Sequence, residues 1–156
     1  MSLRPVARGD EEFLLRVYSS TRAEELAVTG WDDATRRAFL AQQFRAQDHH
    51  YRTNYEHASL DVILVDGEAA GRLYVARWAE EIRVMDIALL PEYRGRGIGE
   101  GLLTDLLGEA ARARKAVTIH VERENRAMTL YRRLGFEEVD EHGVYVLMEA
   151  RPAIGG

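Results

Sequence analysis

Residues 87–99 read Ile-Ala-Leu-Leu-Pro-Glu-Tyr-Arg-Gly-Arg-Gly-Ile-Gly. An apolar run typical of a strand ends at Pro91, three glycines then alternate with other residues, and leucines and alanines recur at helical spacing over residues 102–111. This order predicts a strand, a glycine-rich loop and a helix. A glycine loop that opens a helix presents backbone N–H groups and the positive end of the helix dipole, so it suits an anion such as a pyrophosphate.

The spacing of these glycines excludes two common phosphate-binding loops. Gly95, Gly97 and Gly99 alternate, whereas a dinucleotide-binding loop has the spacing Gly-x-Gly-x-x-Gly and a matching acidic residue for the ribose. The Gly-Lys-Ser/Thr sequence of nucleotide triphosphatases is also missing from the loop. The loop by itself does not identify one ligand, so the rest of the chain must narrow the choice.

Hydrophobic periodicity predicts a helix-rich first half and a strand-rich second half. The predicted helices cover residues 10–20, a segment from Asp32 or Asp33 to about residue 47, residues 102–111 and residues 126–134, and residues 49–57 are predicted as a helix end and loop. The predicted strands cover residues 3–6, 60–65, 71–78, 82–89, 116–122, 137–140 and 145–148. Asp10 and one of the two aspartates are the expected helix caps. The segment Asp66-Gly67-Glu68-Ala69-Ala70 predicts a hairpin.

Composition limits the classes of protein and of partner. The chain has 156 residues, which predicts a single domain over residues 1–156. With 21 basic and 26 acidic residues the net charge is −5, which disfavours nucleic acid and anionic membranes as partners. Zero cysteines exclude thiol catalysis and are compatible with a reducing cytoplasm, where we expect the protein. No apolar run approaches the length of a membrane span.

Two motifs together resemble one family. Residues 87–99 look like the acetyl-CoA motif of the GNAT superfamily of N-acetyltransferases, and Asn125 to Phe136, which read Asn-Arg-Ala-Met-Thr-Leu-Tyr-Arg-Arg-Leu-Gly-Phe, resemble its second signature at the expected distance. The resemblance covers residues 59–149 well. It implies an α/β fold with a mixed, mainly antiparallel sheet of six or seven strands, helices on both faces, and a splayed pair of strands that end at Leu89 and Glu122.

The resemblance also divides the chain and assigns a cofactor site. Residues 1–57 would form a helix-rich region on the acceptor side, residues 59–149 the acetyl-CoA-binding and catalytic core, and residues 151–156 a frayed tail. Backbone groups of two leucines would pair with the pantetheine arm, backbone N–H groups of the loop would hold the pyrophosphate, and an asparagine and a tyrosine would lie beside the pantetheine and the thioester. The implied cofactor residues are Leu89, Leu90, Arg94, Gly95, Arg96, Gly97, Ile98, Gly99, Glu100, Gly101, Asn125 and Tyr131.

The reaction of this family poses two proton-transfer problems. The departing thiolate benefits from a proton donor, and the resemblance implies Tyr131 for this role, although the ring also fits a simple packing position. The attacking ammonium must lose a proton. Alternation on the strand 116–122 places Thr118, His120 and Glu122 on one face, and His120 stands where a related branch of the family carries a glutamate base. Glu122, Asp86 or an ordered water without a dedicated base remain alternatives to His120.

The acceptor is the part that the sequence leaves open. We expect a primary amine of a small molecule or peptide, and the candidate pocket residues Trp31, Gln43, Phe44, Gln47 and Tyr51, with Tyr55, fit a helix core or surface equally well. His49, His50 and His57 have no metal-ligand spacing, and we expect no metal. His142 is predicted to lie in a turn. The predicted function is direct acetyl transfer from acetyl-CoA. The alternative is a noncatalytic acyl-CoA-binding sensor or scaffold module, and a homodimer is left open.

Overall fold

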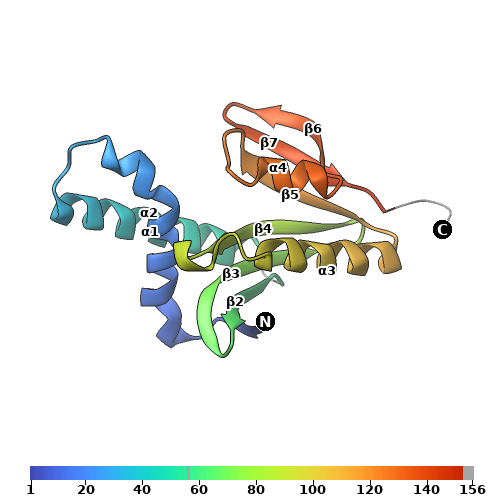
Figure 1. Ribbon diagram of the computed structural model, residues 1–156, viewed down its shortest axis with the longest axis horizontal. Helices are drawn as coiled ribbons and strands as arrows, with labels where there is room; N and C mark the ends of the chain where they lie inside the picture. The colour runs from blue at the N-terminus through green and yellow to red at the C-terminus, as the bar shows by residue number, and fades with distance from the viewer. Residues whose placement is uncertain (56, 153–156) are drawn as a thin grey trace. The chain divides into compact units, whose positions relative to one another are not determined.

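The computed structural model describes residues 1–55 and 57–152. Its elements follow in the order β1 (Ser2–Pro5), the 3-10 turn η1 (Arg8–Asp10), α1 (Glu11–Ala27), α2 (Asp33–Asn54), β2 (Ser59–Val65), β3 (Glu68–Arg77), β4 (Glu81–Leu89), the 3-10 turn η2 (Pro91–Tyr93), α3 (Ile98–Ala113), β5 (Ala116–Glu122), α4 (Met128–Arg133), β6 (Glu137–His142) and β7 (Tyr145–Ala150). Figure 1 shows these elements along the chain. The predicted strand, glycine loop and helix are confirmed as β4, the segment around residue 95, and α3.

The described strands form one mixed sheet in the order β1-β2-β3-β4-β5-β7-β6. Strands β4 and β5 pair in parallel, whereas β1 with β2, β5 with β7, and β6 with β7 pair antiparallel. The mixed, mainly antiparallel sheet of seven strands is therefore as predicted. The parallel ladder runs only from Glu81 opposite Ala116 to Val84 opposite Ile119, while β5 continues its pairing with β7 as far as Glu122. The parallel pairing of β4 with β5 thus ends after four residue pairs, while β5 remains paired with β7.

The chain divides into two compact units, which we describe separately. The first unit contains Met1–Leu73 and Ile87–Arg96. Helices α1 and α2 pack against each other around a cluster of Leu14, Tyr18 and Phe44, each at most 4% exposed. The rings of Tyr18 and Phe44 meet edge to face at 6.1 Å between centroids. This packing fixes the two early helices as one body within the first unit.

The second unit contains Tyr74–Asp86 and the residues from Gly97 onward. Alternate residues of β5 give it a buried apolar face, on which Val117, Ile119 and Val121 are at most 6% exposed. Helix α3 contacts β5, and its buried side is formed by leucines and an alanine at helical spacing. The predicted alternation along residues 116–122 is therefore confirmed, except that Thr118 on the polar face is also buried, at 5% exposed.

Both early helices are longer than predicted. Helix α1 continues past residue 20 to Ala27 because Leu26 extends its buried stripe and Arg22 pairs with Glu25 one turn away. Helix α2 continues through residues 48–54, where Arg52 pairs with Asp48 and Asn54 donates to the carbonyl of His50. Part of the predicted loop at residues 49–57 is therefore helical.

Of the two expected caps, one is correct and one is wrong. Asp32 accepts a hydrogen bond from the backbone N–H of Thr35 at 2.7 Å and caps α2. Asp10 makes no side-chain cap for α1. Its carboxylate instead accepts from the N–H of Ala7 at 2.7 Å and from both terminal nitrogens of Arg4 at 2.8 Å. Asp10 thus joins β1 to the turn η1 rather than starting the helix.

The β2–β3 hairpin is tighter than the predicted five-residue connection. Only Asp66 and Gly67 lie between the strands, with φ of 51° and 81°. Two positive φ values in succession are what a two-residue hairpin turn requires, and Asp-Gly is a preferred pair for it.

Of the predicted frayed tail, residues 153–156 lie outside the described residues. No helix in the described ranges has the length and apolar character needed to cross a membrane.

Candidate active site

The glycine loop leads directly into the N-terminus of α3. Gly95 and Gly97 adopt φ of 73° and 78°, a left-handed conformation that other residues rarely take, and Gly97 is the N-cap of the helix. A Cβ added at Gly95, Gly97 or Gly99 would meet no atom within 4 Å. The protein therefore leaves open space beside each glycine, and this space suits a ligand that approaches the backbone.

The backbone N–H groups of this segment are largely available. Within the described ranges, the N–H groups of residues 96–100 donate to no backbone carbonyl, as expected for the first turn of a helix. Two groups of the predicted set are already used, because the N–H of Arg94 donates to Pro91 at 3.2 Å and that of Gly101 donates to Gly97 at 3.0 Å. Residues 96–100 are thus the better candidates for holding an anion.

The side chain of Arg94 supports the start of the loop from within the first unit. Its Nε donates to the backbone carbonyl of Leu89 at 3.1 Å, and a terminal nitrogen lies 3.4 Å from the hydroxyl of Ser20 on α1. Next to it, the guanidinium of Arg96 lies over the ring of Tyr93 at 5.3 Å from the centroid. These contacts position the loop, and the sequence motif gave no indication of them.

At the end of β4, the backbone N–H and C=O groups of Leu89 and Leu90 point in different directions. Leu90 donates to Ala70 at 2.9 Å and accepts from Tyr93 at 2.9 Å, so both of its groups have partners in the protein. Neighbouring residues of a strand point their N–H and C=O groups to opposite sides. The groups of Leu89 therefore point away from β3, where its carbonyl accepts from Nε of Arg94 at 3.1 Å. Leu89 is the better of the two candidates for pairing with an added strand-like ligand, because β3 uses neither of its groups.

Asn125 and Tyr131 belong to the second unit. The amide oxygen of Asn125 accepts from the N–H of Ala127 at 2.7 Å, an Asx turn that leads into α4. Among the described residues its side-chain nitrogen has no hydrogen-bond partner. Asn125 thus shapes the turn before α4 without capping it, since the N-cap is Ala127, and one donor group remains for a ligand.

Tyr131 is buried on α4 at 3% exposed, with its ring 6.0 Å from that of Phe136 in an edge-to-face contact. Burial raises the pKa of Tyr131 to about 12, and the nearby charge of Asp86 adds to this shift. No residue in the described part of the chain shares a hydrogen bond with its hydroxyl. Tyr131 therefore keeps its proton at neutral pH and has it to donate.

His120 lies in a cluster on the polar face of β5. Its ring is 5.3 Å from that of Tyr145 and 6.2 Å from that of His142, while His142 contacts the carboxylate of Asp140 at 2.9 Å. Partial burial lowers the pKa of His120 below its usual 6.5, and the charges of Arg83 and His142 lower it further against an opposing effect of Asp140. The imidazole is therefore neutral at pH 7 and able to accept a proton.

The other two candidate bases have different surroundings. The charge of Asp86 raises the pKa of Tyr131. The pKa of His120 depends instead on the charges of Arg83, His142 and Asp140. Glu122 is half-buried at the end of β5, and its backbone carbonyl accepts from the N–H of Asn125 at 2.9 Å.

His142 is the residue near the candidate base that the sequence did not predict, since a histidine beside a glycine suggests only a turn. In the structure it ends β6 and faces His120.

The five candidate acceptor residues do not form one group. Trp31 packs on Phe39 at 5.2 Å between ring centroids, and Gln43 is exposed. Gln47 accepts from the guanidinium of buried Arg72 at 2.8 Å, and the ring of Tyr51 meets that of Tyr55 edge to face at 6.2 Å between centroids. Phe44 lies in the core of the α1–α2 pair. Their assignment to an acceptor pocket stays a prediction.

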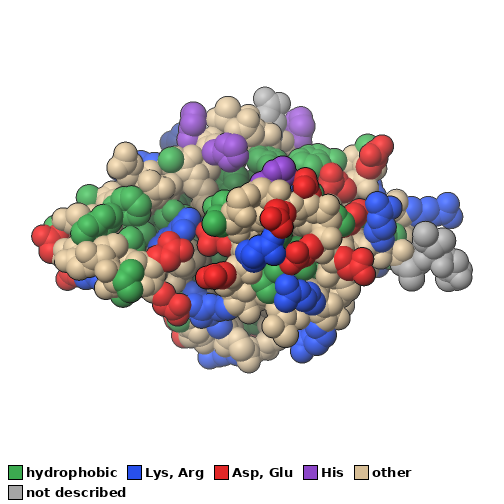
Figure 2. Space-filling view, turned by 90° about the horizontal axis from the view of Figure 1, so that it is seen from above, with side chains coloured by type: hydrophobic (Ala, Val, Ile, Leu, Met, Phe, Trp, Pro, Cys, Tyr) green, Lys and Arg blue, Asp and Glu red, His purple; other side chains and the backbone are tan. Residues whose placement is uncertain are grey.

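The surface charges of the protein are mixed in sign. Figure 2 shows acidic and basic side chains interspersed over the face in view, without a continuous basic surface on that face. Within residues 1–55 and 57–152, no group of three or more histidine, aspartate or glutamate side chains is arranged to hold a metal ion.

Comparison with known proteins identifies the family. The family model described as "Acetyltransferase (GNAT) domain" matches residues 55–138, which is more than half of the chain. The chain therefore belongs to the GNAT acetyltransferase family. An uncharacterized protein of Mycobacterium leprae is 43% identical over 60 residues, which covers 38% of this chain and only 16% of that protein.

Solved structures agree with the fold. PaiA N-acetyltransferase from Thermoplasma acidophilum in complex with coenzyme A superposes with a TM-score of 0.71 at 18% identity, covering 96% of this chain and 98% of that one. The ribosomal-protein-S18-alanine N-acetyltransferase from Escherichia coli gives 0.67 at 17% identity, covering 99% and 96%. A GNAT family acetyltransferase from Elizabethkingia anophelis with acetyl-CoA bound gives 0.62 at 17% identity, covering 96% and 97%. At these identities the likeness establishes the fold, and family membership supports acyl transfer to an amine as the general reaction.

Proposed function

We propose that the protein is an acetyl-CoA-dependent N-acetyltransferase that acts on a primary amine by direct attack on the thioester. The observation that carries this proposal is the loop at residues 94–99, in which two left-handed glycines precede a helix whose first N–H groups are available. Those groups suit the pyrophosphate of coenzyme A, since they combine hydrogen-bond donors with the positive end of the α3 dipole. Membership of the GNAT family also supports acetyl-CoA as the acyl donor.

The remaining proposed cofactor contacts use the backbone of Leu89, whose carbonyl also accepts from Nε of Arg94, and the side chain of Asn125. Leu89 would pair with the pantetheine arm through backbone groups that point away from β3, and the side-chain nitrogen of Asn125 would donate to a pantetheine carbonyl. The family motifs support these two assignments. No covalent acyl-enzyme on cysteine is available, because the chain contains no cysteine.

In the proposed reaction, the amine nitrogen forms a bond to the thioester carbon and the carbon–sulfur bond breaks. His120 accepts the proton that the ammonium must lose: its lowered pKa weakens it as a base but keeps its ring neutral, with a nitrogen able to accept, at pH 7. Glu122, Asp86 and an ordered water remain alternatives for this step. Fixed geometry, rather than a metal, provides the main part of the acceleration in this proposal.

Tyr131 is assigned to the departing sulfur. With a pKa of about 12, its hydroxyl is a weaker acid than a thiol, whose ordinary pKa is about 8.5. Complete proton transfer from Tyr131 to the thiolate is therefore unfavourable. We infer that Tyr131 stabilises the developing thiolate by donating a hydrogen bond, and that solvent delivers the final proton.

Calorimetry with acetyl-CoA tests the proposal, followed by thiol release across a panel of primary amines. We expect saturable binding and turnover with at least one amine. Absence of binding at millimolar acetyl-CoA would refute the proposed cofactor. Binding without turnover on any amine would instead favour the alternative function, a noncatalytic acyl-CoA-binding module.

A further inference from the structure

A pocket of about 410 Å³ opens between η1 with the start of α1 and the middle of α2, entirely within the first unit. Its apolar part is formed by Leu15, Ala41 and Phe44, and Phe44 is only 3% exposed. This size lies within the range typical of small-molecule sites, which combine an apolar lining with a few polar groups. The glycine loop at residues 94–99 contributes no residue to this lining.

The rim of the pocket carries charges of both signs. Four charged residues line it: Arg8, Glu11, Glu12 and Arg45. Within the described ranges, none of these four side chains forms an ion pair or a side-chain hydrogen bond. The pocket therefore gathers cationic and anionic groups that the protein itself leaves available.

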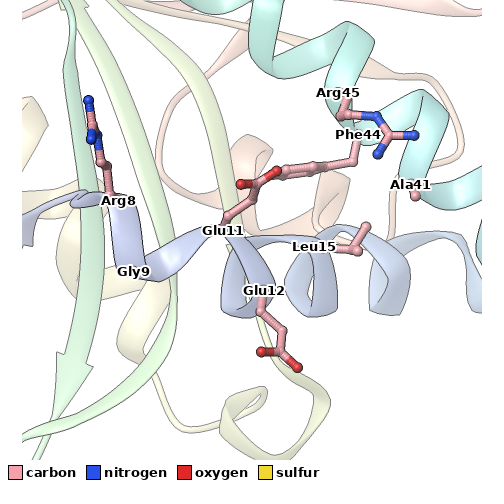
Figure 3. Close-up of a pocket in the computed structure, with 8 residues that line it drawn as sticks. All are labelled: Arg8, Gly9, Glu11, Glu12, Leu15, Ala41, Phe44 and Arg45. Atoms are coloured by element: carbon pink, nitrogen blue, oxygen red, sulfur yellow. The ribbon is translucent and has the colours of Figure 1, made fainter.

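The ring of Phe44 separates one anionic group of the rim from one cationic group, while Arg8 lies on the far side of Glu11 (Figure 3). In the view of Figure 3, the ring of Phe44 lies between the carboxylate of Glu11 and the guanidinium of Arg45, while Glu12 points away. A guanidinium binds a carboxylate through two parallel hydrogen bonds, and a carboxylate pairs with an ammonium. An occupant that satisfies both ends must carry a negative and a positive group on an apolar body.

We propose that this pocket binds a small zwitterion of the amino acid or short peptide class. Its carboxylate would meet Arg45, its ammonium would meet Glu11, and its apolar side chain would cover Phe44 between them. Binding at this pocket is separate from the binding of acetyl-CoA and does not depend on the proposed transfer reaction.

Titration of the isotopically labelled protein with L-leucine and with L-leucyl-L-leucine, followed by NMR without acetyl-CoA, tests the proposal. We expect shift changes at Glu11, Phe44 and Arg45 that saturate in the micromolar to millimolar range. N-acetyl-L-leucine lacks the ammonium and L-leucinamide lacks the carboxylate, so each should bind at least tenfold more weakly than L-leucine. Tighter binding of L-leucine would identify a free amino acid as the occupant, and tighter binding of the dipeptide a peptide.

Substitutions locate the site. Arg45→Gln and Glu11→Gln should each weaken binding about tenfold, and Ala41→Trp should abolish it by filling the pocket. Arg37→Gln is the matched control, because Arg37 lies on the same helix outside the lining and should leave binding unchanged. Both charged residues are exposed, so the variants should keep the fold, which circular dichroism checks. Equal binding of the blocked analogues, or no localised shift changes up to about 10 mM ligand, would overturn the proposal.

Discussion

Gly71 on β3 faces the backbone carbonyl of Ala88 on β4 so closely that a Cβ at Gly71 would lie 2.1 Å from that oxygen. The same Cβ would lie 3.0 Å from the Cα of Leu89. Real carbon atoms do not approach a backbone oxygen this closely, so any other residue would force the strands to shift. The absence of a side chain here lets β4 keep its position just before the glycine loop.

Gly71→Ala should therefore lower the free energy of unfolding by roughly 3 kcal/mol, as expected for overpacking against a rigid backbone. Chemical denaturation measures this loss. Gly108→Ala is the control, since that glycine lies inside α3 and its Cβ would meet only the end of Arg112 at 3.4 Å. The control should be neutral or stabilising by up to about 1 kcal/mol. Equal stability of the two variants would contradict the close approach at Gly71.

Gly99→Ala tests the proposed pyrophosphate site without backbone strain. Gly99 lies in the first turn of α3 and has an ordinary φ, and its Cβ would meet no protein atom within 4 Å. The fold should be unaffected, whereas the dissociation constant for acetyl-CoA should rise at least tenfold, about 1.4 kcal/mol, because the methyl group enters the space assigned to the ligand. Unchanged affinity in calorimetry would refute this placement.

Tyr131→Phe keeps the buried ring and removes only the hydroxyl. If Tyr131 donates a hydrogen bond to the leaving thiolate, its loss should cost about 1.5–3 kcal/mol, or roughly 10- to 150-fold in kcat. The affinity for acetyl-CoA should change little. Steady-state kinetics with the best amine from the panel measures both quantities. A variant with unchanged kcat would show that Tyr131 contributes to packing only and gives no hydrogen bond to the thiolate.

The pH dependence of kcat/KM tests His120. A lowered pKa places the acidic limb of the profile below pH 6.5, since the neutral ring is the active form and is lost as pH falls through its pKa. His120→Ala should remove that limb. Arg83→Gln should shift it to higher pH, because a charge that lowers the pKa has been removed. Glu122→Gln is the control and should leave the limb in place, so its loss in that variant would point to Glu122 as the base.

Asp10 should contribute to stability in a defined pH range. The hydrogen bonds from Arg4 and from the N–H of Ala7 lower the pKa of Asp10 from 3.8 to about 2. Its contribution is therefore fully present above pH 3.8 and is lost as pH falls from 3.8 toward 2.

We expect Asp10→Asn to cost about 1–2 kcal/mol at pH 7, discounted for the exposure of Arg4, and nothing below pH 2. Denaturation curves across pH measure the difference. Asp33→Asn, which removes an exposed pair with Arg36, should have a much smaller effect. A cost for Asp10→Asn that persists unchanged at pH 2 would contradict the assigned pKa.

The sequence predicted the elements of the fold that carry a strong local pattern. Strand β5 matches its prediction residue for residue because apolar and polar residues alternate there, and the glycine loop was evident from its spacing. Helix α1 was predicted too short, because its last turns rely on an ion pair and one buried leucine rather than on a dense apolar stripe. Local patterns therefore located the strands better than the helix ends.

The missed features depend on contacts between distant segments. Gly71 was predicted only as the start of a strand, since the closeness of Ala88 arises from pairing with a strand later in the chain. The contact of His142 with the ring of His120 depends on the order in which β5, β7 and β6 pair. No spacing along one segment encodes such neighbours, so the surroundings of the candidate base had to come from the structure.

Strand β6 closes the sheet order at one side, and all six of its residues are exposed. Its pairing with β7 has a bulge between Glu138 and Asp140, where Val139 has no partner in the register. Four of its six side chains are carboxylates. A bulge and charges on both faces prevent an outer strand from serving as a template for a second chain. Copies of this protein are thereby kept from joining into a continuous sheet through β6, and self-association has to use another surface.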